Sequence, residues 1–264
     1  MLSPQKWIES KQNKKKITMV TCYDYSFAKI LNQTGVDVLL IGDSSEMVIY
    51  GQAHTLGSDV NKLATLTSAV RLGAPDKFIV TDVPFGLMQA EDGEFFRAIK
   101  AFMQSGANAI KIEGVNTYEE RFAKLSAMGV PVMGHLGLTP QHIQQFGGFK
   151  VQGKTEESRK KIVEQAIKLE HMGAFAMVLE CVPSELARVI TAEVAIPTIG
   201  IGAGKDVDGQ VLVLQDLLGF NPDFKPKFVR HYLNGFQIVS EAINSYVNDV
   251  KGASFPSEVE SYEL

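Results

Sequence analysis

Three acidic residues, Asp43, Asp82 and Glu113, each lie directly beyond a short β-rich apolar run. Carboxylates that meet on one edge of a sheet raise one another's pKa unless a cation lies among them. Oxygen ligands without a cluster of His or Cys favour Mg²⁺ over zinc. The residue types and their repeated position therefore predict a Mg²⁺ site formed by these three carboxylates.

Lys111 and His135 lie at the ends of neighbouring apolar runs. Lys111 would place a positive charge near an anionic substrate. It is also two residues from Glu113 on the same strand face, so the two side chains could instead pair with each other. His135 is a candidate for substrate positioning, although a single His after a strand is as often structural.

Glu180 closes a later run and is flanked by Leu179, Cys181 and Val182. Burial among these neighbours would raise the pKa of its carboxyl, which suits a general base near neutral pH. The alternative is an N-cap for a helix that opens at Pro183, a role for which Glu is poorly suited.

The elements that would position these residues are eight apolar runs separated by helix-like segments. Most runs are continuous, as in parallel strands buried on both faces. Such alternation predicts a (β/α)₈ TIM-type barrel, with chemistry at the carboxyl ends of the strands, and an open doubly wound sheet is the alternative. The runs cover residues 17–22, 38–41, 78–81, 109–112, 132–134, 176–179, 198–201 and 211–214.

The helical periodicity is clearest over residues 157–172, where Ile162, Ala166 and Leu169 share a face. Gly173 follows at the position of a left-handed C-cap. The gap between the last two runs is too short for a full crossover helix, so either that helix is very short or one strand is misplaced. The glycines at 200–204 fit a phosphate site of barrels, but backbone freedom at a crowded rim explains them equally well.

The composition is that of a soluble globular protein, with 264 residues, 45% of them apolar, and a net charge of −4. We expect one catalytic domain over residues 1–264, with 251–264 as a loose tail. The charge predicts no nucleic-acid partner, and the absence of a long apolar stretch predicts no membrane span. Two cysteines form no disulfide framework and indicate a reducing, cytoplasmic location.

Long motifs over most of the chain resemble the ketopantoate hydroxymethyltransferase family, and they occur in that family's order. The motifs are YDYSFAK at 23–29, GDS at 42–44, DVPF at 82–85, KIEG at 111–114, GHLGLTPQ at 134–141, FGGFKVQG at 146–153 and LECVP at 179–183.

The resemblance implies a (β/α)₈ barrel that transfers a hydroxymethyl group from 5,10-methylenetetrahydrofolate to 3-methyl-2-oxobutanoate. The product would be 2-dehydropantoate, on the route to pantothenate and coenzyme A. It implies a homo-oligomer, typically a decamer. It assigns Mg²⁺ to Asp43 and Asp82, with Glu113 nearby, and proton abstraction to Glu180. The oxo acid is assigned to Asp43, Ser44, Asp82 and Lys111.

The chain departs from the family pattern around Asp43. Glu46 stands where Gly is usual, Gly57 where Pro is usual, and Leu66 where His is usual. These changes could alter the geometry of the Asp43 loop. Two alternatives to an active transferase follow: a barrel that binds 2-oxo acids without turnover, and a related metal-dependent lyase that acts on another 2-oxo acid.

Overall fold

The computed structural model describes residues 3–115 and 118–262, and within them eight parallel strands form one closed barrel. β1 pairs with β2 on one side and with β8 on the other, where Ile17 lies opposite Gly209. The predicted barrel is confirmed, and the open sheet is wrong. The strands are β1 (Ile17–Thr21), β2 (Val38–Ile41), β3 (Phe78–Asp82), β4 (Ala109–Glu113), β5 (Val132–Gly137), β6 (Ala176–Glu180), β7 (Thr198–Ile201) and β8 (Gly209–Leu212).

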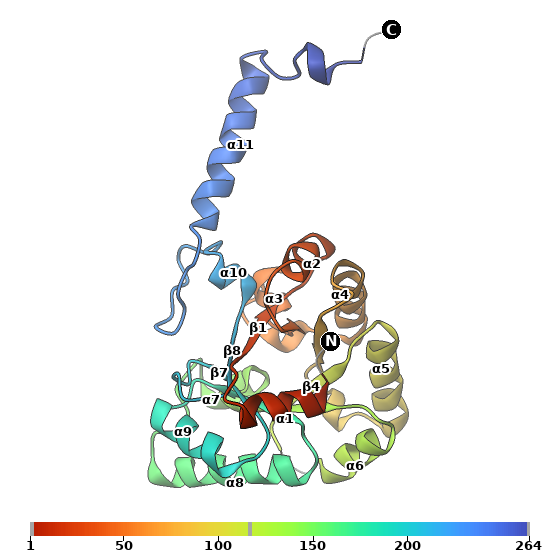
Figure 1. Ribbon diagram of the computed structural model, residues 1–264, viewed down its shortest axis with the longest axis vertical. Helices are drawn as coiled ribbons and strands as arrows, with labels where there is room; N and C mark the ends of the chain where they lie inside the picture. The colour runs from red at the N-terminus through yellow and green to blue at the C-terminus, as the bar shows by residue number, and fades with distance from the viewer. Residues whose placement is uncertain (1–2, 116–117, 263–264) are drawn as a thin grey trace. The chain divides into compact units, whose positions relative to one another are not determined.

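Helices surround the strands (Figure 1), which explains why β3 and β4 are buried at every residue. The helices of the barrel are α1 (Pro4–Gln12), α2 (Tyr25–Asn32), α3 (Ser45–Val48), α4 (Val60–Gly73), α5 (Asp92–Gln104), α6 (Glu119–Ala127), α7 (Ile143–Phe146), α8 (Glu156–His171) and α9 (Ser184–Glu193). Short 3₁₀ turns are η1 (Thr55–Gly57), η2 (Leu87–Gln89) and η3 (Pro140–His142).

α8 shows how the sequence specifies these helices. Thr155 caps its first turn through a hydrogen bond from the amide of Ser158, and the predicted face of Ile162, Ala166 and Leu169 is buried. Beyond the helix, Gly173 has φ +93°, a left-handed conformation that favours glycine. The predicted amphipathic helix and its C-terminal glycine are both confirmed.

The eighth strand begins and ends two residues earlier than predicted. The prediction placed it at 211–214, whereas β8 spans Gly209–Leu212 and Leu214 starts α10. The apolar run gave no sign of this shift, because pairing with β1 depends on the backbone at Gly209. A Cβ there would lie 2.4 Å from the carbonyl oxygen of Ile17, so only glycine permits this approach.

The short gap between the last two strands holds no helix. Residues 202–208 join β7 directly to β8, and the two strands pair as neighbours, with Ile199 opposite Gly209. A crossover helix is therefore missing here, while both strands are present. Gly204 in this loop has φ +81°, and a Cβ on it would lie 2.4 Å from Cβ of Ser184. This glycine meets a steric need, in keeping with the backbone interpretation of the segment.

The amino-terminal end of the barrel is closed by α1. Trp7 is fully buried, and its ring centroid lies 5.6 Å from that of Phe78 and 5.2 Å from that of Phe175. Both phenylalanines lie at or next to the first residue of a strand. The aromatic cluster therefore fills the end of the barrel opposite the carboxyl ends of the strands.

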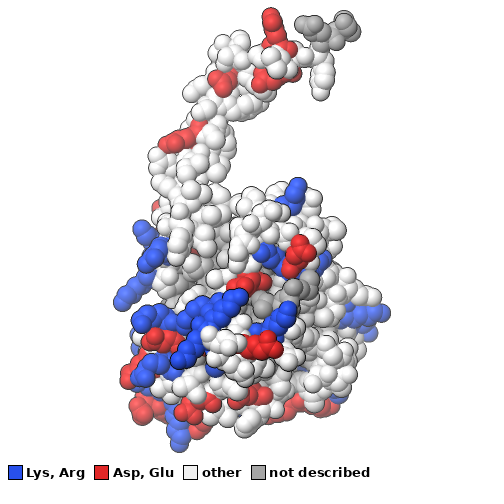
Figure 2. All heavy atoms as spheres, viewed as in Figure 1, with Lys and Arg blue, Asp and Glu red and all other residues white. Residues whose placement is uncertain are grey.

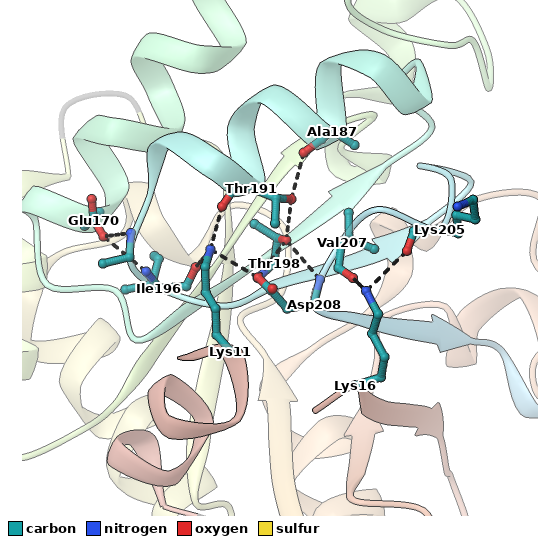
Figure 3. Close-up of polar contacts among 11 residues, drawn as sticks. Lys11, Lys16, Glu170, Ala187, Thr191, Ile196, Thr198, Lys205, Val207 and Asp208 are labelled. Carbon is teal, nitrogen blue, oxygen red and sulfur yellow. Dashed lines mark hydrogen bonds and ion pairs between the residues drawn. The ribbon is translucent and has the colours of Figure 1, made fainter. Parts of the chain in front are cut away.

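Polar contacts of Lys11 hold the same end together (Figure 3). Nζ of Lys11 donates to the carbonyl oxygens of Thr191 and Ile196 at 2.7 and 3.0 Å and lies 3.2 Å from Oδ2 of Asp208. Asp208 also accepts from the amide of Thr198 at 2.9 Å. One ammonium group thus joins α1 to the end of α9 and to the strand that follows it.

The chain divides into two compact units, Met1–Val213, which carries the barrel, and Leu214–Leu264. The second unit contains α10 (Leu214–Leu217), α11 (Gly235–Lys251) and η4 (Glu258–Glu260). The loop between α10 and α11 is closed by backbone hydrogen bonds. Among them, the amide of Tyr232 donates to the carbonyl of Leu217 and that of Gly235 to the carbonyl of Leu218, both at 2.8 Å. The expected single domain and loose tail stay predictions.

Candidate active site

The ionisable residues predicted at the strand ends lie in one buried cluster. Asp82 ends β3, Lys111 and Glu113 lie on β4, His135 lies on β5 and Glu180 ends β6. The parallel register brings them to the same level, because Asp82 lies opposite Lys111 and Glu113 lies opposite His135. Asp43 follows β2 after one glycine. All of these side chains except Glu180 are at most 5% exposed.

Asp43 is held against Asp82 by its backbone. The amide of Asp43 donates to Oδ2 of Asp82 at 2.9 Å, both residues being buried. Gly42 leaves room for the hydroxyl of Ser44, since a Cβ there would lie 2.8 Å from Oγ of Ser44. Oγ of Ser44 lies 2.7 Å from the hydroxyl of Tyr23, which orients it at the edge of the cluster.

Lys111 forms its nearest ion pair with Asp82. Its Nζ lies 3.0 Å from Oδ1 of Asp82, 3.2 Å from Nδ1 of His135 and 3.9 Å from Oε1 of Glu113. The pairing of Lys111 with Glu113 that the sequence left open is thus the longest of the three contacts. The lysine instead connects the acidic pair at β2 and β3 with the histidine on β5.

His135 joins the acidic cluster to Glu180. Its Nδ1 lies 3.3 Å from Oε1 of Glu113 and its Nε2 lies 3.2 Å from Oε2 of Glu180. Glu180 does not cap the next helix, whose N-cap residue is Pro183. The carboxylate therefore points toward the imidazole, and the N-cap alternative is wrong.

The residue after Glu180 has an uncommon backbone conformation. Cys181 has φ +48°, in the left-handed region that non-glycine residues seldom adopt. Hydrogen bonds on both sides hold it there, since its amide donates to Ile201 and its carbonyl accepts from Gln152, each at 2.9 Å. Burial raises the pKa of the Cys181 thiol to about 12, so this side chain is a neutral neighbour of the cluster.

Two residues of the site were not assigned a role from the sequence. Gln141 in η3 donates through its side-chain Nε2 to Oδ2 of Asp43 at 3.0 Å. Its backbone N–H donates to Oε2 of Glu113, also at 3.0 Å. Tyr23 contacts Ser44 as described. Both lie inside motifs shared with the family. Tyr23 directly follows the run at 17–22 but is not an acidic residue, and Gln141 follows no apolar run.

Burial and crowding set the charges of the cluster. Burial, together with the charges of Glu113 and Asp82, raises the pKa of Asp43 well above its usual value. Burial also raises the pKa of Asp82 against the opposing charge of Lys111. Burial and Lys111 act to lower the pKa of His135, but Glu113 and Glu180 outweigh them and raise it to about 9. The cluster thus carries more acidic than basic groups.

The acidic groups suit a divalent cation in number and chemistry. In the described residues no three His, Cys, Asp or Glu side chains converge closely enough to form a complete metal site by themselves. Mg²⁺ commonly takes only one or two carboxylates and fills its remaining positions with water or substrate. Oδ1 of Asp82 and Oε1 of Glu113 are buried and face the cationic groups of Lys111, at 3.0 Å, and His135, at 3.3 Å. These buried carboxylates and the adjacent Asp43 fit such an ion.

The sequence is similar to known proteins over nearly its whole length. The sequence model of a family described as ketopantoate hydroxymethyltransferase matches residues 2–258. A 3-methyl-2-oxobutanoate hydroxymethyltransferase of Bdellovibrio bacteriovorus is 52% identical, over 96% of this chain and 97% of that protein. One from Francisella tularensis subsp. novicida is 49% identical, over 97% and 96%.

Solved structures share the fold. A phosphonopyruvate hydrolase in complex with oxalate and Mg²⁺ aligns with a TM-score of 0.63 at 11% identity, over 98% of this chain and 93% of that one. At this identity the likeness concerns the fold alone. In the described part of the chain, none of the helices has the length and apolar character needed to cross a lipid bilayer.

Proposed function

This chain belongs to the ketopantoate hydroxymethyltransferase family, and from that membership we propose that it transfers a hydroxymethyl group to 3-methyl-2-oxobutanoate. The one-carbon donor is 5,10-methylenetetrahydrofolate, water supplies the hydroxyl oxygen, and the product is 2-dehydropantoate, a precursor of pantothenate. The observation that carries the proposal is the contact between His135 and Glu180, which connects a candidate base to the buried acidic cluster at 3.2 Å.

The reaction requires removal of a proton from C3 of the oxo acid, which is far too weakly acidic to lose it to a free carboxylate at neutral pH. We assign the removal of this proton to Glu180, at the end of β6. His135 fixes the direction of that carboxylate, because its two ring nitrogens lie 3.3 Å from Glu113 and 3.2 Å from Glu180. A base held in one orientation is more effective than a mobile one.

Negative charge develops on the 2-oxo group as the proton leaves. Mg²⁺ bound by Asp43 and Asp82, with Glu113 nearby, would supply Lewis-acid stabilisation of that charge. Lys111 places its ammonium 3.0 Å from Asp82 and offers a second positive charge for the substrate carboxylate. The hydroxyl of Ser44, oriented by Tyr23, is available to hydrogen bond the same substrate.

Water adds to the methylene carbon of the folate, and its two C–N bonds break to release tetrahydrofolate and leave the carbon as formaldehyde. The deprotonated C3 attacks that carbon in the same pocket, and the resulting alkoxide takes up a proton to become the hydroxyl of the product. Binding both reactants together removes the entropy cost of a second encounter. We favour turnover over a binding function because every charged group that the chemistry needs is present at the cluster.

Two unpaired cysteines also support a reducing location, which we propose to be the cytoplasm.

The test is product formation. The purified protein, with Mg²⁺, 3-methyl-2-oxobutanoate and 5,10-methylenetetrahydrofolate, should form 2-dehydropantoate, measured by mass spectrometry. Omitting the folate should abolish the product. Substrate binding without product would support the binding protein instead. Cleavage of a 2-oxo acid in the absence of folate would support the lyase.

We further propose a homo-oligomer, of which α11 forms part of the interface. Along this helix Phe236, Val239, Ile243, Tyr246 and Val250 recur every three or four residues, a spacing that places them on one face. Figure 2 shows few charged side chains on α11. Such a face normally packs against another surface. Light scattering should give a mass several times 28.9 kDa, ten times for a decamer, and Ile243→Glu should lower it, whereas a wild-type monomer would contradict the proposal.

A further inference from the structure

Glu46 is a buried carboxylate outside the acidic cluster. It is 2% exposed and lies in α3, the short helix that starts directly after Asp43 and Ser44. Its amide donates to the carbonyl of Asp43 at 3.0 Å, and its own carbonyl accepts from the amide of Gln52 at 2.8 Å. Any displacement of Glu46 is therefore transmitted to the backbone that carries Asp43.

Lys62 holds this carboxylate in place. Its Nζ lies 3.0 Å from Oε1 of Glu46 and donates to the carbonyl oxygen of Gly57 at 3.0 Å. The ammonium also lies 5.1 Å from the ring centroid of Tyr50. Lys62 comes from the first turn of α4, so one side chain connects α3, η1 and α4.

Gly57 leaves the space that the carboxylate occupies. A Cβ on residue 57 would lie 2.9 Å from Oε2 of Glu46, closer than real Cβ contacts. Since Oε1 of Glu46 is bound to Lys62, moving the carboxylate away would lengthen that ion pair. The two residues are thus matched to each other, a glycine on η1 opposite a long acidic side chain on α3.

We propose that Glu46 is a positioning residue for the candidate active site, which acts through Lys62 to hold the loop of Asp43 and Ser44. The inference rests on the proposed function for its kinetic consequence, but its structural consequence is independent of it. A buried carboxylate that loses its cation must move or take up a proton. Either change would loosen α3 and with it the approach of Asp43 to Asp82.

Hydrogen exchange of the backbone amides provides the structural test. In Glu46→Gln and Lys62→Met, the amides of Met47, Val48 and Ile49 should exchange at least tenfold faster than in wild type, while the amides of the barrel strands stay unchanged. The matched control is Glu164→Gln, which removes a carboxylate from an exposed ion pair with Lys160 and should have no effect on these amides. Unchanged exchange at 47–49 in both variants would overturn the inference.

Kinetics provide the second readout. For deuterium exchange at C3 of 3-methyl-2-oxobutanoate, Glu46→Gln should raise the Mg²⁺ concentration for half-maximal rate about fivefold to tenfold, with the rate at saturating Mg²⁺ within about twofold of wild type. The double variant Glu46→Gln/Lys62→Met should need no more Mg²⁺ than Lys62→Met alone, because Lys62→Met already removes the ion pair that Glu46→Gln disrupts. Additive losses, or loosened amides with unchanged Mg²⁺ dependence, would contradict a positioning role.

Gly57→Ala tests the match between the two residues. It should raise the required Mg²⁺ concentration when Glu46 is present and have no further effect in Glu46→Ala, where the space is empty. An equal effect in both backgrounds would contradict the match. If the wild-type protein shows no C3 exchange at all, the proposed function fails, while amide exchange still decides whether Glu46 holds the loop.

Discussion

Nε2 of His135 lies 3.2 Å from Oε2 of Glu180, and the opposite nitrogen of the same ring lies 3.3 Å from Oε1 of Glu113. One imidazole therefore spans two carboxylates that come from different strands. This arrangement separates two tasks in space, since Asp43, Asp82 and Glu113 form the acidic side of the site and Glu180 stands on the other side of His135.

Glu180→Gln should abolish exchange of the C3 proton, with a loss of at least about 100-fold, because the amide cannot accept the proton. Binding of the oxo acid and of Mg²⁺ should be retained, since Glu180 lies apart from Asp43 and Asp82. NMR of the substrate in D₂O measures exchange, and calorimetry measures binding. Undiminished exchange in this variant would refute the assignment of the base.

The stability of the metal-free protein should fall as the pH rises through the range in which His135 titrates. The pKa of His135 is raised to about 9, against 6.5 for the unfolded chain, so the protonated ring stabilises the folded state. This contribution is complete below about pH 6.5 and is lost as the pH approaches 9. Urea denaturation should show a loss of about 3 kcal/mol across that window. In His135→Asn the loss should be much smaller, and an equal slope in both proteins would exclude His135 as its source.

Asp82→Ala should weaken Mg²⁺ binding at least tenfold, about 1.4 kcal/mol. Asp82 provides a buried carboxylate that pairs with Lys111 at 3.0 Å, and it also accepts a hydrogen bond from the amide of Asp43. The variant thus removes one candidate ligand and releases the backbone of another. Calorimetric titration gives the affinity, and Asp92→Ala, at a surface ion pair, serves as the control. The same affinity in Asp82→Ala and wild type would place the metal elsewhere.

Lys11→Met should lower the free energy of unfolding by about 1–3 kcal/mol, because two carbonyl oxygens lose their donor and Asp208 loses its cation at the amino-terminal end of the barrel. Activity at a temperature where the variant stays folded should equal that of wild type, since this network lies at the end of the barrel away from the candidate site. Denaturant titration measures the difference. Lys160→Met, at a lysine whose side chain is 80% exposed, should change stability by less than about 0.5 kcal/mol.

The barrel could be predicted from the sequence because most strands are buried apolar runs and longer helices between them, such as α5 and α8, have an apolar face. The same periodicity explains why the acidic residues met at one rim, since parallel strands end at the same edge of a barrel. It could not place β8 correctly. The apolar run 211–214 continues past the end of β8. The start of the strand is set by the close approach of the Gly209 backbone to Ile17 on β1.

The contacts made by loops could not be predicted from the sequence. Gln141 bonds to Asp43 and Glu113 because η3 folds back over the rim, a path that no periodicity indicates. The exchange of glycine for Glu46 looked like a disturbance of the Asp43 loop. In the structure Glu46 has a partner, Lys62, and a matching space at Gly57. The two departures from the family pattern, at residues 46 and 57, therefore contact each other in the structure.

The most direct test of the account is exchange of the C3 proton of 3-methyl-2-oxobutanoate for deuterium, followed by NMR, with and without Mg²⁺ and in the absence of folate. We expect exchange that depends on Mg²⁺ in the wild-type protein and none in Glu180→Gln. Binding of the oxo acid without any exchange in the wild-type protein would contradict the account, and would mean that the cluster around His135 binds the substrate but does not remove its proton.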